Sequence, residues 1–144
     1  MTKIGFYILD NADEASRITL ALRLTDKAFQ RGHRVFIHCE SNDQARELDQ
    51  RLWSFRPASF LPHALCTTDG AEQEPIAIGW DQAPKAHDDL LINMCPEIPG
   101  FFARFQRVAE LVNQEPDRLR ALRESYRYYR DRGYAIEQHR LAGV

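Results

Sequence analysis

Several common signatures are missing from this sequence of 144 residues. Its three cysteines form no CxxC pair, so neither a disulfide framework nor a zinc site is indicated, and we expect a reducing compartment, the cytoplasm. Neither GxGxxG nor GxxxxGK[ST] occurs, which excludes the common phosphate-binding loops. No apolar run approaches the roughly 20 residues of a membrane-spanning helix. Lys3 precedes only a short apolar run, so we expect no secretory signal.

Lysine is also scarce, because only Lys3, Lys27 and Lys85 contribute to the 19 basic residues. The formal net charge of -2 argues against a general nucleic-acid-binding protein. Arginine is concentrated from residue 101 onward, where nine arginines accompany six acidic residues. The planar guanidinium group suits specific recognition of carboxylates and phosphates. The C-terminal part therefore predicts a specific anionic partner.

Buried strands and amphipathic helices alternate along the chain, which predicts parallel strands joined by helical crossovers. We expect one α/β domain over residues 1–144, with three layers: a mostly parallel sheet and helices on both faces. The layout is that of nucleotide-binding folds without their phosphate loop. Expected strands span residues 4–9, 34–39, 75–80 and 90–95, and expected helices span residues 13–31, 41–53, 101–112 and 117–133.

Three further segments are less regular. Residues 59–65, SFLPHAL, are too short and too interrupted by proline for a central strand, so we expect an edge strand or a loop. Residues 67–75 are polar and predict an exposed loop. Residues 134–141 predict either a last short strand or a docked tail.

The stretch 117–133, DRLRALRESYRYYRDRG, predicts a helix that begins near Asp117 and ends at Gly133. One apolar face follows from the spacing of Leu119, Leu122, Tyr126 and Tyr129. Beside it runs a stripe of Arg120, Arg123, Arg127 and Arg130. This pattern has two interpretations. The stripe either binds a ligand that is both acidic and apolar, such as a peptide end, or is a solvated face whose arginines pair with Glu124 and Asp131.

Aromatic and apolar residues gather in the irregular middle of the chain: Trp53, Phe55, Phe60, Leu61 and Pro62. Prolines and short strands make it difficult to bury all of these side chains. They are therefore either anchors for a protein partner or a cover over the core.

Evidence for catalysis is weak. Asp10 and Glu40 follow the first two expected strands, where α/β proteins place ligands, and two carboxylates there are able to hold Mg²⁺. The simpler interpretation is that they cap the following helices. Cys66 has only His63 nearby in sequence, and no GxSxG motif occurs. We expect no active site, metal or cofactor.

Taken together, the segments resemble the chi subunit family of bacterial DNA polymerase III. The similarity covers nearly the whole chain, and its most specific pattern is LDxxLWxxxxxSFxPHxL at residues 48–65. The matching segments are FYILDN at 6–11, RVFIHCE at 34–40, QARELDQRLW at 44–53, SFLPHAL at 59–65, PIAIGW at 75–80 and LRESYRYYRDRGY at 122–134.

The resemblance implies a non-catalytic accessory subunit for DNA replication. Family members pair with the psi subunit, through which they join the clamp loader, and they grip the acidic, phenylalanine-ending tail of single-stranded DNA-binding protein. By position, the psi contacts are Trp53, Phe60, Pro62 and His63. The tail contacts are Arg123 and Arg127, with Arg120 and Tyr126 beside them. Leu119 occupies a position where relatives can carry another basic residue.

Two alternatives from other classes remain open. One is a metal- or nucleotide-dependent α/β enzyme that uses Asp10 and Glu40. The other is direct binding of single-stranded DNA by the arginine and tyrosine stripes, which the net negative charge disfavours.

Overall fold

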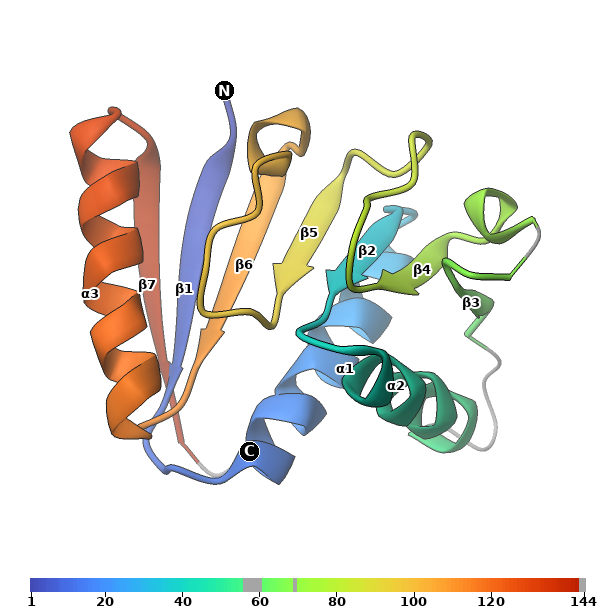
Figure 1. Ribbon diagram of the computed structural model, residues 1–144, viewed down its shortest axis with the longest axis horizontal. Coiled ribbons are helices and arrows are strands. Elements are labelled where there is room, and N and C mark those ends of the chain that lie inside the picture. The colour runs from blue at the N-terminus through green and yellow to red at the C-terminus, as the bar shows by residue number, and fades with distance from the viewer. Residues whose placement is uncertain (56–60, 69, 143–144) are drawn as a thin grey trace.

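The computed structural model describes residues 1–55, 61–68 and 70–142. This part of the chain forms one sheet of seven parallel strands in the order β3-β4-β2-β5-β6-β1-β7 (Figure 1). The strands are β1 (Lys3–Leu9), β2 (Val35–His38), β3 (His63–Leu65), β4 (Ile76–Gly79), β5 (Leu90–Asn93), β6 (Arg107–Val112) and β7 (Ala135–Leu141). The helices are α1 (Glu14–Gln30), α2 (Asn42–Phe55) and α3 (Pro116–Asp131), with the short 3-10 helices η1 (Ala71–Gln73) and η2 (Phe102–Arg104). The α/β fold predicted from the sequence is confirmed.

The three α-helices divide between the two faces of the sheet. Helices α1 and α2 lie on one face and α3 lies on the other (Figure 1). Successive side chains of a strand point to opposite faces. In β1, Ile4, Phe6 and Ile8 accordingly pack in the cluster that contains Tyr129 of α3, whereas Leu9 packs in the cluster of α1 and α2. The fold therefore has three layers and two apolar cores.

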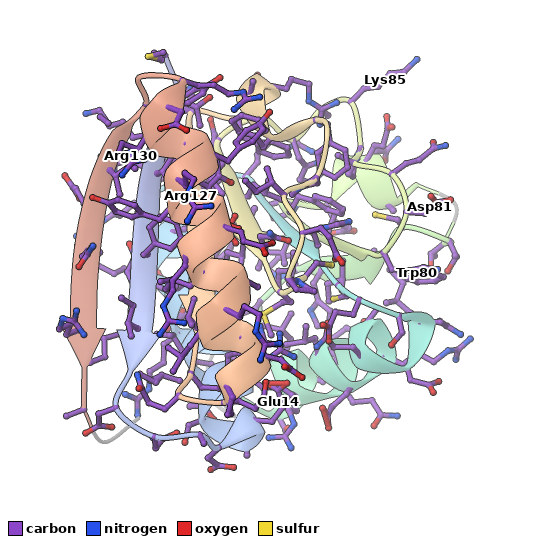
Figure 2. The ribbon with its side chains drawn as sticks, turned by 60° about the vertical axis from the view of Figure 1, so that its left-hand side comes forward. Glu14, Trp80, Asp81, Lys85, Arg127 and Arg130 are labelled. Atoms are coloured by element: carbon purple, nitrogen blue, oxygen red, sulfur yellow. The ribbon has the colours of Figure 1, made fainter. Side chains whose placement is uncertain are left out.

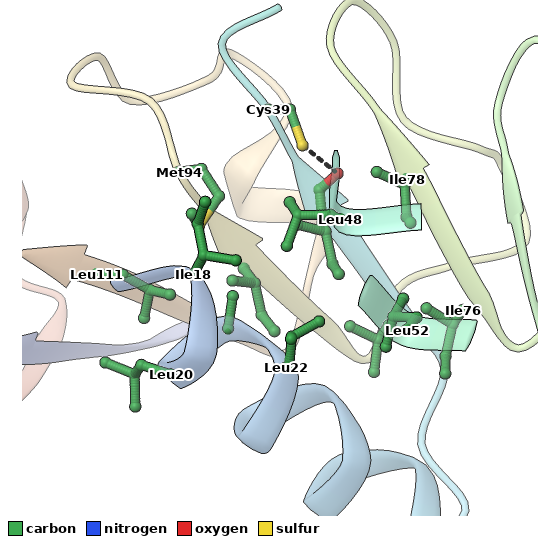
Figure 3. Packing of buried hydrophobic residues seen from close by; sticks show 14 of the residues in the cluster. Ile18, Leu20, Leu22, Cys39, Leu48, Leu52, Ile76, Ile78, Met94 and Leu111 are labelled. Carbon is green, nitrogen blue, oxygen red and sulfur yellow. Dashed lines mark hydrogen bonds between the residues drawn. The ribbon is translucent and has the colours of Figure 1, made fainter. Parts of the chain in front are cut away.

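The core beneath α1 and α2 is made of aliphatic side chains at helical spacing. Ile18 and Leu22 of α1 pack with Leu48 and Leu52 of α2 over the sheet, where Ile78 of β4 meets them (Figure 3). Each such burial contributes roughly 1.5–3 kcal/mol. This layer is held by apolar burial.

The helix ends follow from local sequence. The side chain of Asp13 accepts a hydrogen bond from the backbone of Ala15 at 3.2 Å and so caps α1. Gly32, at a φ of 81°, takes the left-handed conformation that follows the helix. Ser41 Oγ accepts from the backbone N–H of Gln44 at 3.1 Å and starts α2.

In the described ranges, no helix combines the length and apolar character needed to cross a membrane.

Residues 101–112 do not form the helix that their apolar spacing predicted. Only the short η2 is helical, and residues 107–112 form β6 between β5 and β1. Val108 pairs in register with both Ile4 and Leu91, so its strand is central and covered on both faces. An apolar run of this length fits a helix face and a buried strand equally well. Backbone pairing with two neighbouring strands decides between them.

The two edges of the sheet settle two open expectations. Strand β3 lies at one edge, as the proline-interrupted segment 59–65 predicted, although Phe60 lies outside the described residues. Strand β7 lies at the other edge and pairs with β1 from Lys3 to Leu9, so residues 134–141 contain a strand and not a docked tail.

Candidate functional site

Helix α3 presents the predicted arginine stripe to solvent. Arg120, Arg123, Arg127 and Arg130 are all exposed, and Figure 2 shows Arg127 and Arg130 on this helix. The helix begins near Asp117, as predicted, and its N-cap is Glu115, whose carboxylate accepts from the backbone N–H groups of residues 117 and 118. Glu115 and Pro116 fix the first turn.

The four arginines of the stripe differ in their partners. Arg120 pairs with Asp117 at 2.7 Å, and Arg130 pairs with Asp131 at 3.0 Å. Across the described residues, no carboxylate pairs with Arg123 or Arg127. The two available guanidinium groups are therefore those to which the family resemblance points.

Apolar surface adjoins the arginine stripe on the side of β7. Leu119, Leu122 and Tyr126 are half-buried, and with Ile136 of β7 they pack against the core of the α3 layer. The ring of Tyr126 lies 5.9 Å from that of Phe6. This surface offers apolar contact beside positive charge, which is the combination that an acidic peptide with an apolar end requires.

The orientation of α3 is fixed by a buried polar contact. Tyr129 is fully buried, and its hydroxyl donates to Glu110 Oε2 of β6 at 2.7 Å. Asn93 Nδ2 donates to Glu110 Oε1 at 2.9 Å. Burial raises the pKa of Glu110 to about 7 and raises that of Tyr129 above its usual value. These hydrogen bonds hold the inner face of α3 to the sheet, so the stripe faces outward.

At the opposite edge of the sheet, Trp53 and His63 come together. Trp53 of α2 is 56% exposed, and its ring centroid lies 4.4 Å from that of His63 in β3. His63 is buried and its ring nitrogens contact the carbonyl oxygens of Leu61 at 2.6 Å and Asp49 at 3.0 Å. Pro62, which precedes His63 in the sequence, is half-buried. We call Trp53, Pro62 and His63 the aromatic patch.

Both interpretations of the irregular middle segment apply, but to different residues. Leu61 is buried in the core, and Phe55 packs partly against it, so these two side chains cover the core. Trp53 instead presents more than half of its surface to solvent. Phe60 lies outside the described residues. Of the residues with a predicted role in psi binding, the structure thus places Trp53, Pro62 and His63 at one edge.

The crevice in which related folds bind nucleotides is closed by the protein itself. Strand β1 continues into α1 on one face and β6 into α3 on the other, which is the switch point where α/β folds bind ligands. Here Gln114 Nε2 donates to Leu9 O at 2.8 Å, and the backbone N–H of Gln114 donates to Asn11 O at 2.7 Å. The fully buried Arg17 donates to Met94 O at 3.0 Å.

Glu40 is part of an ion-pair group at this crevice. Arg118 Nη2 lies 3.1 Å from Glu14 and 3.3 Å from Glu40. Asp10 is exposed, and among the described residues no ion pair joins it to this group. Nor do three potential metal ligands gather anywhere in residues 1–55, 61–68 and 70–142. The spacing of arginines in the sequence did not predict that Arg17 bonds a buried carbonyl or that Arg118 pairs with Glu14 and Glu40.

The cysteines are not activated thiols. Cys39, Cys66 and Cys95 are free. Burial raises the pKa of Cys66 to about 11 and that of Cys95 to about 12, so both thiols are protonated at neutral pH. Cys66 and His63 therefore do not have the electrostatic surroundings of a nucleophile and its base.

Comparison with known proteins gives one consistent family. The family model described as "DNA polymerase III chi subunit, HolC" matches residues 1–137. The chain is 45% identical over 144 residues to DNA polymerase III subunit chi of Pseudomonas aeruginosa, covering 100% of both chains. It is 34% identical over 132 residues to that of Haemophilus influenzae (91% of this chain, 92% of the relative) and 32% identical over 141 residues to that of Escherichia coli (94% and 96%).

Proposed function

The chain belongs to the DNA polymerase III chi subunit family, and from this premise we propose that it links two parts of the replication machinery without catalysis. One partner is the psi subunit, and through it the clamp loader. The other is the acidic, phenylalanine-ending tail of single-stranded DNA-binding protein. The free thiols of all three cysteines support a cytoplasmic location.

The tail binds along α3 in this proposal. Arg123 and Arg127 hold the terminal carboxylate and a neighbouring acidic side chain, while the phenylalanine packs against the half-buried Leu119 and Tyr126. The observation that carries this assignment is that both guanidinium groups lack a carboxylate partner within the described residues, beside apolar surface. Hydrogen bonds between charged groups contribute roughly 1.5–3 kcal/mol each.

The psi subunit binds the aromatic patch in this proposal, and Phe60, the remaining residue with a predicted role in psi binding, lies outside the described residues. This patch lies at the β3 edge, and the arginine stripe lies beyond the other half of the sheet, over β1 and β7 (Figure 1). The sheet separates the two surfaces, so both partners can bind at the same time. A linking subunit requires this arrangement.

The test is a titration of the protein with a short acidic peptide that ends in phenylalanine, compared with the same peptide amidated at its C-terminus. We expect the free-acid peptide to bind, and both amidation and added salt to weaken it. Arg123→Glu should weaken binding at least tenfold. Arg23→Glu, an equal charge change at an exposed position of α1, is the matched control. Equal affinity of Arg123→Glu and the control would exclude the stripe as the tail site.

A further inference from the structure

A second positively charged site lies at the amino end of the sheet. There, a hollow of about 490 Å³ is lined by residues from the starts of β1 and β6 and from η2. Three of its lining side chains are cationic, namely Lys3, Arg104 and Arg107, and none is acidic. The whole chain carries a net charge of -2, so this concentration of positive charge departs from the average surface. No residue of the arginine stripe takes part in it.

The three cations line one hollow, and within the described residues none of them forms an ion pair with a carboxylate. Lys3 and Arg107 are register partners on adjacent strands, where like charges repel. Arg104 Nη2 donates to Pro84 O at 2.6 Å and His87 O at 2.9 Å, and its guanidinium carbon lies 5.1 Å from the centroid of the Phe105 ring. Arg104 is therefore fixed in position.

Three acidic residues lie near the hollow. Asp88 is exposed, and its backbone carbonyl accepts from the N–H of the lining residue Gln106 at 2.9 Å. The other two, Glu137 and Asp89, have side-chain contacts of their own. Glu137 lines a neighbouring small cavity with Lys3 and Arg107, but its carboxylate contacts His139 Nε2 at 3.5 Å. Asp89 Oδ2 accepts from the backbone N–H of residue 34 at 2.7 Å. In the described part of the chain, no carboxylate lies within ion-pair distance of Lys3, Arg104 or Arg107. An external anion would relieve their mutual repulsion.

The surroundings favour peptide carboxylates over nucleic acid. Single-stranded nucleic acid is bound by stacking its bases on exposed aromatic rings. Phe105, the aromatic residue that lines the hollow, is only 1% exposed, and the nearby Tyr7 is already stacked on His139 at 4.6 Å. Arginine forks pair well with carboxylates. An acidic peptide segment fits this site better than single-stranded DNA does.

The hollow lies at the end of the sheet where α3 ends, although Lys3 and Arg107 alternate with Ile4 and Val108 and so point to the face opposite α3. Lys3 is in register with Ala135, the first residue of β7, and α3 ends just before that strand. Figure 1 shows the N-terminus, η2 and the turn between α3 and β7 at the same end of the sheet. We propose that this hollow binds the side-chain carboxylates of an acidic peptide segment. Its natural source, which rests on the proposed function, is the acidic stretch that precedes the end of the bound tail.

The test uses an acidic octapeptide of Asp and Glu, blocked at both ends, and a matched peptide of Asn and Gln. Fluorescence anisotropy measures their binding to the wild type, to Lys3→Gln/Arg107→Gln and to Arg23→Gln/Lys27→Gln. All four substituted side chains are exposed, and each variant removes two positive charges. We expect the acidic peptide alone to bind, with at least fivefold weaker binding to Lys3→Gln/Arg107→Gln and no such loss in the α1 control.

Equal affinity of the two double variants for the acidic peptide would overturn the proposal. Binding of an oligo-dT that depends on Lys3 and Arg107, without binding of the acidic peptide, would also overturn it. Failure of the tail proposal is a separate result. It would appear as tail-peptide binding that Arg123→Glu does not change, while the acidic octapeptide still depends on Lys3 and Arg107.

Discussion

The two edges of the sheet carry surfaces of opposite character. At the β3 edge, the large exposed side chain is Trp53, whose ring packs on the buried His63. Along α3, the aromatic residues are buried or half-buried and the arginines of the stripe are exposed. Binding at the first surface should depend on apolar area, and binding at the second on charge. If the proposed partners bind at these two surfaces, they should not compete with each other for the protein.

The helices beneath these surfaces are also attached differently. Helix α2 is held mainly by Ala45, Leu48 and Leu52, which are apolar and buried, and also by the contact of His63 in β3 with the carbonyl oxygen of Asp49. Helix α3 is held partly by the hydrogen bond from Tyr129 to the buried Glu110. Apolar contacts do not titrate, whereas a buried carboxyl group does. The attachment of α3 to the sheet should therefore weaken as Glu110 loses its proton.

The largest expected effect is that of Glu110→Gln on the pH dependence of the free energy of unfolding. The pKa of Glu110 is about 7 in the folded protein, above its ordinary 4.5. The folded state thus binds this proton more tightly than the unfolded state. The resulting stability is fully present below pH 4.5 and is lost as the pH rises through 7. The loss is about 3 kcal/mol. Glu110→Gln should remove this dependence, which urea unfolding at pH 5 and pH 8 measures.

Glu124→Gln is the matched control, because it removes an exposed carboxylate from α3 itself. Hydrogen exchange then locates the effect. Protection of α3 amides, corrected for intrinsic exchange, should fall between pH 5 and pH 8 in the wild type and remain constant in Glu110→Gln. The same slope of stability with pH in the wild type and in Glu110→Gln would show that another group controls it.

The second prediction concerns the aromatic patch. Trp53→Ala should weaken psi binding by about 2 kcal/mol, or roughly thirtyfold, as expected for an exposed tryptophan at the centre of an interface. Calorimetric titration with purified psi should show the same loss at low and moderate salt. Arg51→Ala, an exposed residue on the same helix, should leave the affinity unchanged. If the affinity for psi fell strongly with added salt, the aromatic patch would not differ from the arginine stripe in the way proposed.

Much of the fold followed from local sequence. Six elements lie within a few residues of their expected positions: β1, β2, β4, β5, α1 and α2. The apolar and arginine faces of α3 are also as expected. These elements carry their own signals, such as Asp13 and Ser41 as caps and Gly32 as a stop. Strand β6 carried no such signal, because Val108 and Val112 suit a helix face as well as a strand. Its neighbours β1 and β5, distant in sequence, determine its structure.

The site shows the same division between local and distant information. Spacing alone placed four arginines on one face of α3. Which of them lack partners depends on the nearby Asp117 and Asp131, and the contact between Tyr129 and Glu110 joins residues from two elements. Periodicity describes one element at a time, so it contains no information about contacts of this second kind.

The smallest expected effect separates the members of the stripe. Arg120 is paired with Asp117, and both side chains are exposed, so the pair contributes only about 0–1 kcal/mol. Because this guanidinium already has a partner, Arg120→Ala should weaken tail-peptide binding less than about threefold, against at least tenfold for Arg123→Ala. Asp117→Asn provides the companion test, since it releases Arg120 and should leave tail binding unchanged or slightly tighter. If Arg120→Ala and Arg123→Ala weaken binding equally, the tail recognises the total positive charge of α3 and not its two unpaired arginines.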